Sequence, residues 1–165
     1  MSAEPLRRTV RFKNREMTLT WLDPARLPDI ERISAASVVP FTPAGDIVLA
    51  KLARGLEIPG GEVAESDPDV EATARREAWE EACVVLGALV PVQLIEVDCP
   101  GAPDLLRHVV VYAGHVIRMP SFVRRHESSG RVVVSPDEYV ERVRFGRPDD
   151  RRLLVAQAKA AVGID

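Results

Sequence analysis

The chain has 165 residues, of which 46% are hydrophobic and 28% charged, and this length and composition are typical of a single globular domain with a substantial core. A formal net charge of −3 at pH 7 gives no general attraction to nucleic-acid backbones or acidic membranes, so neither a polynucleotide nor a membrane is expected as a partner. No secretory signal pattern opens the chain and no apolar run reaches about 18 residues, which predicts a cytoplasmic protein.

Residues 6–22 are predicted to form a β-hairpin ahead of the main fold. Thr9–Phe12 and Met17–Trp21 alternate polar and apolar residues around the turn segment Lys13–Glu16, which is typical of two half-buried strands. The expected role of this hairpin is an edge ribbon that covers the sheet, and a homodimer contact or a wall of the substrate site are the alternatives. Leu22–Glu31 contains two prolines and is expected to be a connector.

Two apolar strands and a short third strand are predicted next. Ile33–Thr42 and Ile47–Leu52 are joined by the sequence Pro-Ala-Gly-Asp at 43–46, whose residues favour a turn. Leu56–Ile58 is a short strand, and it ends at the sequence Pro-Gly-Gly at 59–61. A tight glycine turn is therefore expected directly before the next element.

The segment after this turn is predicted to be a helix with an acidic face. Asp67 is expected to cap the helix and Pro68 to be its first residue, because proline lacks only an N–H that would be unpaired there. At about 100° per residue, Glu77, Glu80 and Glu81 fall within an arc of about 100°. Like charges this close repel, and a bound hard divalent cation usually offsets the repulsion. The alternative is an acidic face that is only solvated.

The Pro-Gly-Gly turn followed by Arg-Glu-Ala-Trp-Glu-Glu at 76–81 resembles the signature of the Nudix hydrolase family. That signature reads Gly, five residues, Glu, seven residues, Arg-Glu, an apolar residue, any residue, Glu-Glu, any residue, Gly and an apolar residue. The resemblance is complete at its catalytic end. Asp67 stands where Glu is expected, one residue too far from Arg76, and Cys83 stands where the late Gly is expected.

Members of the Nudix family are Mg²⁺-dependent hydrolases that cleave a diphosphate linked to another group. The resemblance implies that Glu80 and Glu81 bind Mg²⁺, or Mn²⁺ in its place, and that the carbonyl of Gly60 completes the protein ligands. It implies that Glu77 is a further ligand or the general base. Arg76 is expected to pair with Glu80 four residues later and to orient it, and the alternative is an ordinary surface ion pair.

The two departures from the signature carry separate expectations. A left-handed residue at the helix end costs a side chain other than glycine about 1 kcal/mol or more, so the helix is expected to run past Cys83 toward Gly87. Cys83 is expected to be a packed small residue, because no histidine in the motif would activate it. The cysteines and histidines form no cluster with zinc-ligand spacing. All but one of four acidic residues near the helix start are expected to be solvated only: Glu62, Glu65, Asp67 and Glu71.

The remainder of the chain is predicted to alternate strands with one more helix, which favours an α/β sandwich with a mixed central sheet. The resemblance implies the same fold, a Nudix-type α/β/α sandwich spanning residues 1–165 as a single domain. Arg124–Gly130 is expected to be a polar loop that covers a ligand or has no role. The elements predicted after the acidic helix are strands at Val90–Val97, Arg107–Ile117 and Tyr139–Phe145 and an amphipathic helix at Asp149–Val162.

Three charged residues outside the signature are candidates for substrate contacts, Lys51, Arg54 and Glu138, and Glu141 is an alternative to Glu138. Lys51 and Arg54 precede the Pro-Gly-Gly turn and are candidates to approach phosphates, and surface charge is their alternative reading. Glu138, and Glu141 beside it, are candidates for an additional base or ligand near the strand predicted after the polar loop. A solvated carboxylate at a strand end is the alternative for both.

The predicted function is Mg²⁺-dependent hydrolysis of a diphosphate linkage in a small nucleotide-type substrate. Pro100 lies sixteen residues after Val84, a spacing that resembles the marker of ADP-ribose pyrophosphatases within the family. Another nucleoside diphosphate sugar or a (d)NTP remains an alternative substrate. The alternative functions are a Nudix-fold sensor or interaction module that binds a nucleotide without turnover, and a structural α/β domain.

Overall fold

The computed structural model describes residues 3–12 and 14–165. In this part of the chain, nine strands form one sheet whose main path runs in the order β1-β2-β7-β8-β3-β4-β5, with β6 paired to β3 and β9 paired to β4. The β3–β8 pair is parallel and the other pairs are antiparallel, so the sheet is mixed. The strands are β1 Arg7–Phe12, β2 Arg15–Leu22, β3 Ile33–Phe41, β4 Ile47–Leu52, β5 Gly55–Glu57, β6 Gly60–Glu62, β7 Val85–Asp98, β8 Arg107–Arg118 and β9 Arg131–Val134.

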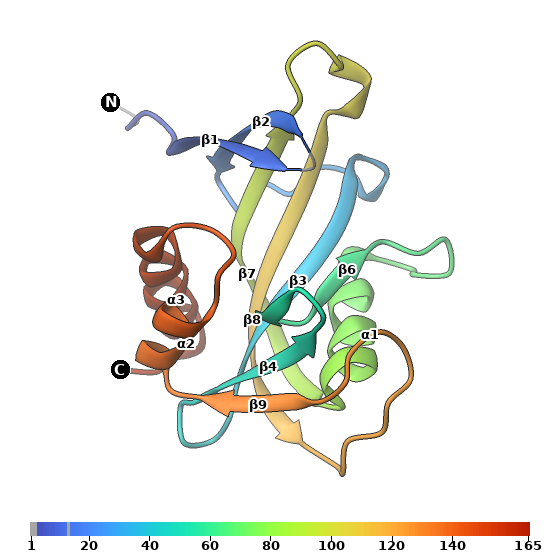
Figure 1. Ribbon diagram of the computed structural model, residues 1–165, viewed down its shortest axis with the longest axis vertical. Coiled ribbons are helices and arrows are strands. Elements are labelled where there is room, and N and C mark those ends of the chain that lie inside the picture. The colour runs from blue at the N-terminus through green and yellow to red at the C-terminus, as the bar shows by residue number, and fades with distance from the viewer. Residues whose placement is uncertain (1–2, 13) are drawn as a thin grey trace.

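Helices cover both faces of this sheet (Figure 1). Helix α1, Val70–Ala82, packs on one face, and α2, Pro136–Arg142, and α3, Pro148–Val162, pack on the other. Short 3₁₀ turns at Ile30–Arg32 and Pro103–Leu105 precede β3 and β8. No helix in the described residues combines the length and the apolar character that crossing a membrane requires.

Two hydrophobic cores lie on opposite sides of β3. Val38 belongs to the core under α1 and Val39 to the core under α3, and both side chains are fully buried. Successive side chains of a strand point to opposite faces, so a strand covered on both sides reads as a continuous apolar run. This arrangement confirms the predicted α/β/α sandwich with a mixed sheet.

The predicted hairpin is formed by β1 and β2, which pair from Arg7 opposite Thr20 to Phe12 opposite Arg15. Lys13, in the predicted turn, lies outside the described residues. Strand β2 then pairs with β7, so the hairpin extends the edge of the main sheet. The guanidinium of Arg8 donates to the carboxylate of Asp150 on α3 with a shortest distance of 3.0 Å, which ties the hairpin to the second helical layer.

Helix α1 begins two residues later than the sequence predicts. Asp69 is its N-cap, and the carboxylate of Asp69 accepts a hydrogen bond from the backbone N–H of Ala72 at 2.7 Å. The predicted cap Asp67 and first residue Pro68 belong to the preceding loop, because the side chain of Asp67 is engaged elsewhere, with Arg76. The prediction of the helix start was therefore wrong by two positions.

The helix end also differs from the prediction. Helix α1 stops at Ala82, and Cys83 adopts the left-handed conformation with φ 52° and ψ 46°. The expected continuation toward Gly87 is wrong, since that residue lies within β7. Cys83 thus takes the backbone conformation that glycine takes at this place, despite the cost of its side chain.

The strand predicted at Tyr139–Phe145 is wrong, because residues 136–142 form α2. Ser135 caps this helix by accepting from the N–H of Glu138 at 3.1 Å, and the carboxylate of Glu138 accepts from the N–H of Ser135 at 2.8 Å. Pro136 occupies the first turn. This Ser-Pro-Asp-Glu sequence is a capping box, which starts a helix where the prediction had a strand.

Candidate active site

The Pro-Gly-Gly turn leads into β6, which lies against the acidic helix. The backbone N–H of Gly60 points to the carboxylate of Glu81 at 3.4 Å. A Cβ atom at Gly61 would collide with the carboxylate of Glu77, and a Cβ at Gly60 would collide with Ser37 on β3. Both positions therefore require glycine for a close approach, Gly61 to a carboxylate and Gly60 to the neighbouring strand.

The three glutamates of α1 face one cavity of about 370 Å³. Glu77 and Glu81 are buried, with exposed fractions of 9% and 3%. Glu80 is half-buried at the edge of the cavity. The structure therefore brings the three predicted carboxylates together beside Gly60.

Arg76 has more partners than the single one predicted. Its Nη1 atom lies 2.8 Å from Glu77 and 3.3 Å from Glu80, so the predicted pairing with Glu80 is present. Its Nε and Nη2 atoms each donate to one oxygen of Asp67 at 2.9 Å. Nη2 also donates to the carbonyl oxygen of Glu62 at 3.0 Å. Arg76 thus joins the acidic helix to the loop that follows β6.

Asp67 stands at the signature position where glutamate is expected. Its carboxylate also accepts from the N–H of Ala64 and from the hydroxyl of Thr73, both at 2.9 Å. The Arg76 guanidinium, helped by these two donors, holds the pKa of Asp67 well below its usual range, and Asp67 in turn raises the pKa of Arg76. Glu65, two positions earlier, is exposed, so of these two acidic residues Asp67 is the one with a structural role.

Electrostatics in the cavity favour a bound cation. Burial raises the pKa of Glu81 to about 8, and the charge of Glu77 adds to this rise. Burial also raises the pKa of Glu77, against the opposing effect of Arg76. Buried carboxylates are stabilised in their charged form by a nearby cation, and oxygen ligands of this kind suit Mg²⁺ and Mn²⁺. The residues present therefore fit the predicted metal.

The carboxylates are not gathered around one point as they stand. Among the residues that the structure describes, no three His, Cys, Asp or Glu side chains converge with metal-ligand geometry. Arg76 engages Glu77 and Glu80, and the ring of His126 lies 3.5 Å from the second oxygen of Glu80. Binding of an ion by all three glutamates thus requires a side-chain rotation, most simply of Glu80.

Two residues of the cavity were missed by sequence reasoning. His126 and Glu127 line it from the β8–β9 loop, residues 119–130. The sequence identifies that segment only as polar. The loop meets α1 through a tertiary contact, and no spacing between residues in the sequence predicts such a contact. A histidine and a glutamate side by side in the loop were the one available signal.

The three candidates outside the signature lie at different distances from the acidic cavity. Arg54 forms two hydrogen bonds to Glu57, at 2.8 and 3.0 Å, and lies 3.9 Å from Glu127, which places it beside the cavity. Lys51 is exposed on β4, and its backbone pairs with the β8–β9 loop. Glu138 caps α2 and does not line the cavity, so its carboxylate already has a structural role.

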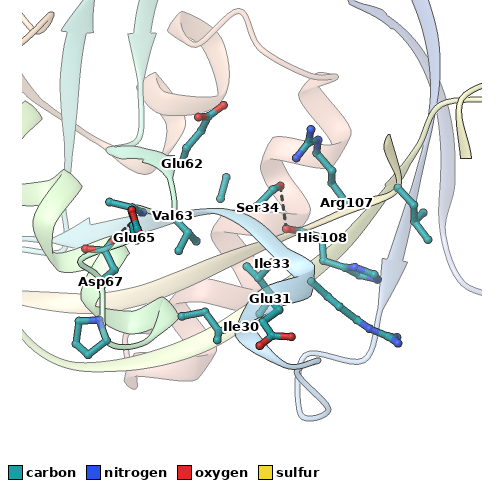
Figure 2. Close-up of a pocket in the computed structure, with 15 residues that line it drawn as sticks. Ile30, Glu31, Ile33, Ser34, Glu62, Val63, Glu65, Asp67, Arg107 and His108 are labelled. Carbon is teal, nitrogen blue, oxygen red and sulfur yellow. Dashed lines mark hydrogen bonds between the residues drawn. The ribbon is translucent and has the colours of Figure 1, made fainter. Parts of the chain in front are cut away.

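A larger cavity of about 1030 Å³ lies at the other end of β6 (Figure 2). Glu62 at the end of β6 and Glu65 in the β6–α1 loop line it together with Arg107 and His108 at the start of β8. It contains none of the three glutamates of α1. The buried carboxylates therefore lie at the smaller cavity.

A model of the NUDIX domain matches residues 31–160. The chain belongs to the Nudix family. The family and fold predicted from the sequence are thereby confirmed, and membership supports the predicted class of enzyme, a Nudix pyrophosphohydrolase. No curated protein matches the sequence significantly.

Solved Nudix structures share the fold at low sequence identity. A mutant of the Bacillus subtilis pyrophosphohydrolase BsRppH superposes with a TM-score of 0.72 at 17% identity, covering 96% of this chain and 99% of that one. The NUDIX domain of Shewanella oneidensis NrtR complexed with ADP ribose gives 0.61 at 16% identity, with 84% and 92% covered. A Caenorhabditis elegans Ap4A hydrolase in a binary complex gives 0.59 at 17% identity, with 78% and 96% covered.

Proposed function

We propose that this Nudix protein is a Mg²⁺-dependent pyrophosphohydrolase that cleaves a diphosphate linkage in a nucleoside diphosphate derivative. The observation that carries the proposal is the buried pair Glu77 and Glu81, held against Gly60 and Gly61 with Glu80 at the cavity edge. A solvated acidic face would leave these side chains exposed. Burying like charges costs free energy, and neutralisation by a cation explains why the fold tolerates them.

Each residue has a defined role in this proposal. Glu80 and Glu81, with the carbonyl of Gly60, hold the divalent ion, and Glu77 is a further ligand or the base that receives the proton of the attacking water. When bound, Mg²⁺ or Mn²⁺ neutralises charge on the phosphoryl oxygens and lowers the pKa of a bound water. Arg76 contacts Glu77 at 2.8 Å and Glu80 at 3.3 Å, which holds both carboxylates at the cavity before the ion binds.

Space near the site and the comparisons both support the proposed substrate class. The similar structures are of a pyrophosphohydrolase, of an Ap4A hydrolase and of a domain complexed with ADP ribose, all consistent with a small nucleotide-type ligand. The Pro100-Gly101 turn lies in the β7–β8 connection, and Leu106 at the end of this connection lines the larger cavity with Arg107, the first residue of β8. ADP-ribose or another nucleoside diphosphate sugar is therefore our first choice, and a (d)NTP or a dinucleoside polyphosphate is the alternative.

A second candidate function is a nucleotide-binding sensor or interaction module without turnover. It is favoured by the absence, within the described residues, of three side chains that converge on one ion. It is also consistent with the similarity to the NrtR domain complexed with ADP ribose. The presence of all three glutamates and of Arg76 favours the enzyme.

The deciding experiment is turnover of a substrate panel with and without Mg²⁺, for the native protein and for Glu81→Gln. The panel contains ADP-ribose, other nucleoside diphosphate sugars, dinucleoside polyphosphates and (d)NTPs. We expect Mg²⁺-dependent hydrolysis and a loss of more than about 100-fold in kcat/KM for Glu81→Gln, since even groups that only support a metal ligand contribute about 10- to 100-fold. Equal activity of both proteins would refute the role of Glu81, and tight binding without hydrolysis would establish the sensor.

A further inference from the structure

The β8–β9 loop forms one wall of the acidic cavity. His126 and Glu127 line the cavity from this loop, and the ring of His126 lies 3.5 Å from the carboxylate of Glu80. Both side chains are more than half exposed, at 56% and 63%. Their own packing therefore does little to hold them, and their position depends on what fastens the rest of the loop.

Cys83, at the end of α1, is a contact point for this loop. The backbone N–H of Val123 donates to its sulfur at 3.4 Å, and the carbonyl of Val123 lies 3.5 Å from the same sulfur. The guanidinium of Arg125 lies 3.1 Å from the sulfur and stacks 4.7 Å from the ring of Trp79. Cys83 is 1% exposed, so the loop covers it completely.

The loop has separate attachments at its far end. Ser129 donates its N–H to the carbonyl of Lys51, and Lys51 donates to the carbonyl of Gly130, each at 2.9 Å. Beyond the loop, Arg131 donates to the carbonyls of Ala82 and Cys83 at 3.0 and 3.2 Å. The stretch that carries His126 and Glu127 is therefore held at 129–131 on one side and by Cys83 and Trp79 on the other.

The backbone at Cys83 makes this side chain significant. Its φ of 52° lies in the left-handed region, where glycine is unstrained and a residue with a Cβ atom is not. A cysteine at this position therefore does not stabilise the end of the helix as a glycine would. The contacts of its sulfur with Val123 and Arg125 are what a glycine would lose.

We propose that Cys83 is a positioning residue for the active site: its sulfur fastens the β8–β9 loop so that His126 and Glu127 stay at the acidic cavity. The functional part of this inference rests on the proposed function, because it treats the acidic cavity as the substrate site. The structural part does not, because the loop attachment is measurable in the metal-free protein without substrate. An experiment can therefore refute either part without refuting the other.

Limited trypsin proteolysis of the metal-free protein tests the attachment. Arg124 and Arg125 are exposed cleavage sites within the loop, and Arg26 in the connector before β3 is an exposed internal reference. We expect Cys83→Ala and Cys83→Gly to accelerate cleavage after Arg124 and Arg125 by roughly tenfold, the effect of one lost anchoring contact on local opening. Cleavage after Arg26 should not change, and Cys99→Ala, which removes the other buried thiol, should leave both rates as in the native protein.

The two variants separate loop anchoring from general packing. Both remove the sulfur, but only Cys83→Gly relieves the left-handed strain, so Cys83→Gly should have the higher Tm while both release the loop equally. Cys83→Ser, whose hydroxyl can accept from Val123 and Arg125, should restore part of the protection. Unchanged cleavage in both variants, or acceleration at Arg26 as large as at the loop, would overturn the proposal.

Kinetics test the functional consequence. We expect Cys83→Gly to raise KM by roughly tenfold with a smaller change in kcat, because a released wall weakens binding of substrate and transition state alike. A loop that is released without any change in KM would overturn the positioning role and leave the attachment intact. Glu81→Gln should keep native loop protection, so loss of catalysis there would concern the proposed function alone.

Discussion

The middle of α1 and its two ends differ in how closely they follow the Nudix signature. In the middle, Arg76, Glu77, Glu80 and Glu81 match it, and two of these glutamates are buried against β6. At the ends, Asp67 replaces a glutamate and Cys83 replaces a glycine. The residues that line the cavity therefore match the signature, and the residues that differ from it are those that support the cavity.

The two ends accommodate their replacements in different ways. The carboxylate of Asp67 accepts hydrogen bonds from both Nε and Nη2 of Arg76, although Asp67 lies one residue farther from Arg76 than the signature's glutamate. Cys83 keeps the left-handed backbone of a glycine and gains contacts with the β8–β9 loop. Supporting positions can therefore change if the contact or the backbone conformation is preserved.

The substitution with the largest expected effect is at Gly61 of β6, which lies against Glu77 in the middle of α1. Gly61→Ala places a methyl group where the carboxylate of Glu77 lies, so Glu77 must move or the strand must shift. We expect kcat/KM to fall by roughly 100-fold, as for other losses of support to a metal ligand. Steady-state kinetics measure this effect, and Gly130→Ala is the control, because its added methyl meets only the flexible side chain of Lys51. Native activity of Gly61→Ala would show that the position of Glu77 is not critical.

A smaller effect is expected from Asp67→Asn, which keeps the size of the side chain and removes its charge. Loss of the charge-assisted pair with Arg76 should lower the free energy of unfolding by roughly 1–3 kcal/mol and kcat/KM by about tenfold. The matched control is Glu65→Gln, an exposed residue two positions earlier, for which a change within about 0.5 kcal/mol is expected. Equal effects of the two variants in urea unfolding would refute the structural role of Asp67.

The pH dependence of this pair follows from the direction of the pKa shift. The pKa of Asp67 is lowered in the folded state, so its contribution to stability is present above its unfolded pKa of about 3.9 and is lost as pH falls through the lower folded value. The free energy of unfolding of Asp67→Asn should therefore fall less steeply than that of the native protein as pH drops below about 4.

The fold and the centre of the site were predictable because their signals are local. The alternating residues of the hairpin, the apolar run of β3 and the spacing from Arg76 to Glu81 each lie within one short segment. Ser135 to Glu138 carried an equally local capping signal, which the prediction of a strand at Tyr139–Phe145 did not use. The error at α2 is thus a missed local pattern.

The rest of the site depends on contacts between distant segments. His126 meets Glu80 across 46 positions of the chain, from a loop whose path is set by its attachments to α1 and β4. The sulfur of Cys83 likewise contacts Val123, forty positions later in the chain. The cost of a left-handed residue predicted that the helix would continue past Cys83, and no local pattern indicated the contacts that Cys83 makes.

The last effect concerns the middle of α1 in the absence of metal. The pKa of Glu81 is raised by burial to about 8, against about 4.3 in an unfolded chain, so between these values the folded state binds a proton that the unfolded state lacks. Stability of the metal-free protein should therefore fall as pH rises from about 4.5 to about 8, by at most about 1.4 kcal/mol per unit.

Glu81→Gln removes this titration, so the variant should show a flatter dependence of Tm on pH across the same window. Mg²⁺ added to the native protein should raise Tm more at pH 8 than at pH 5, because the ion competes with the proton for the same carboxylates. Parallel thermal melts of both proteins, with EDTA and with Mg²⁺, make the measurement. A Mg²⁺ effect that is the same at both pH values, or that persists in Glu81→Gln, would place the ion away from Glu81 and leave the buried glutamates without their counter-charge.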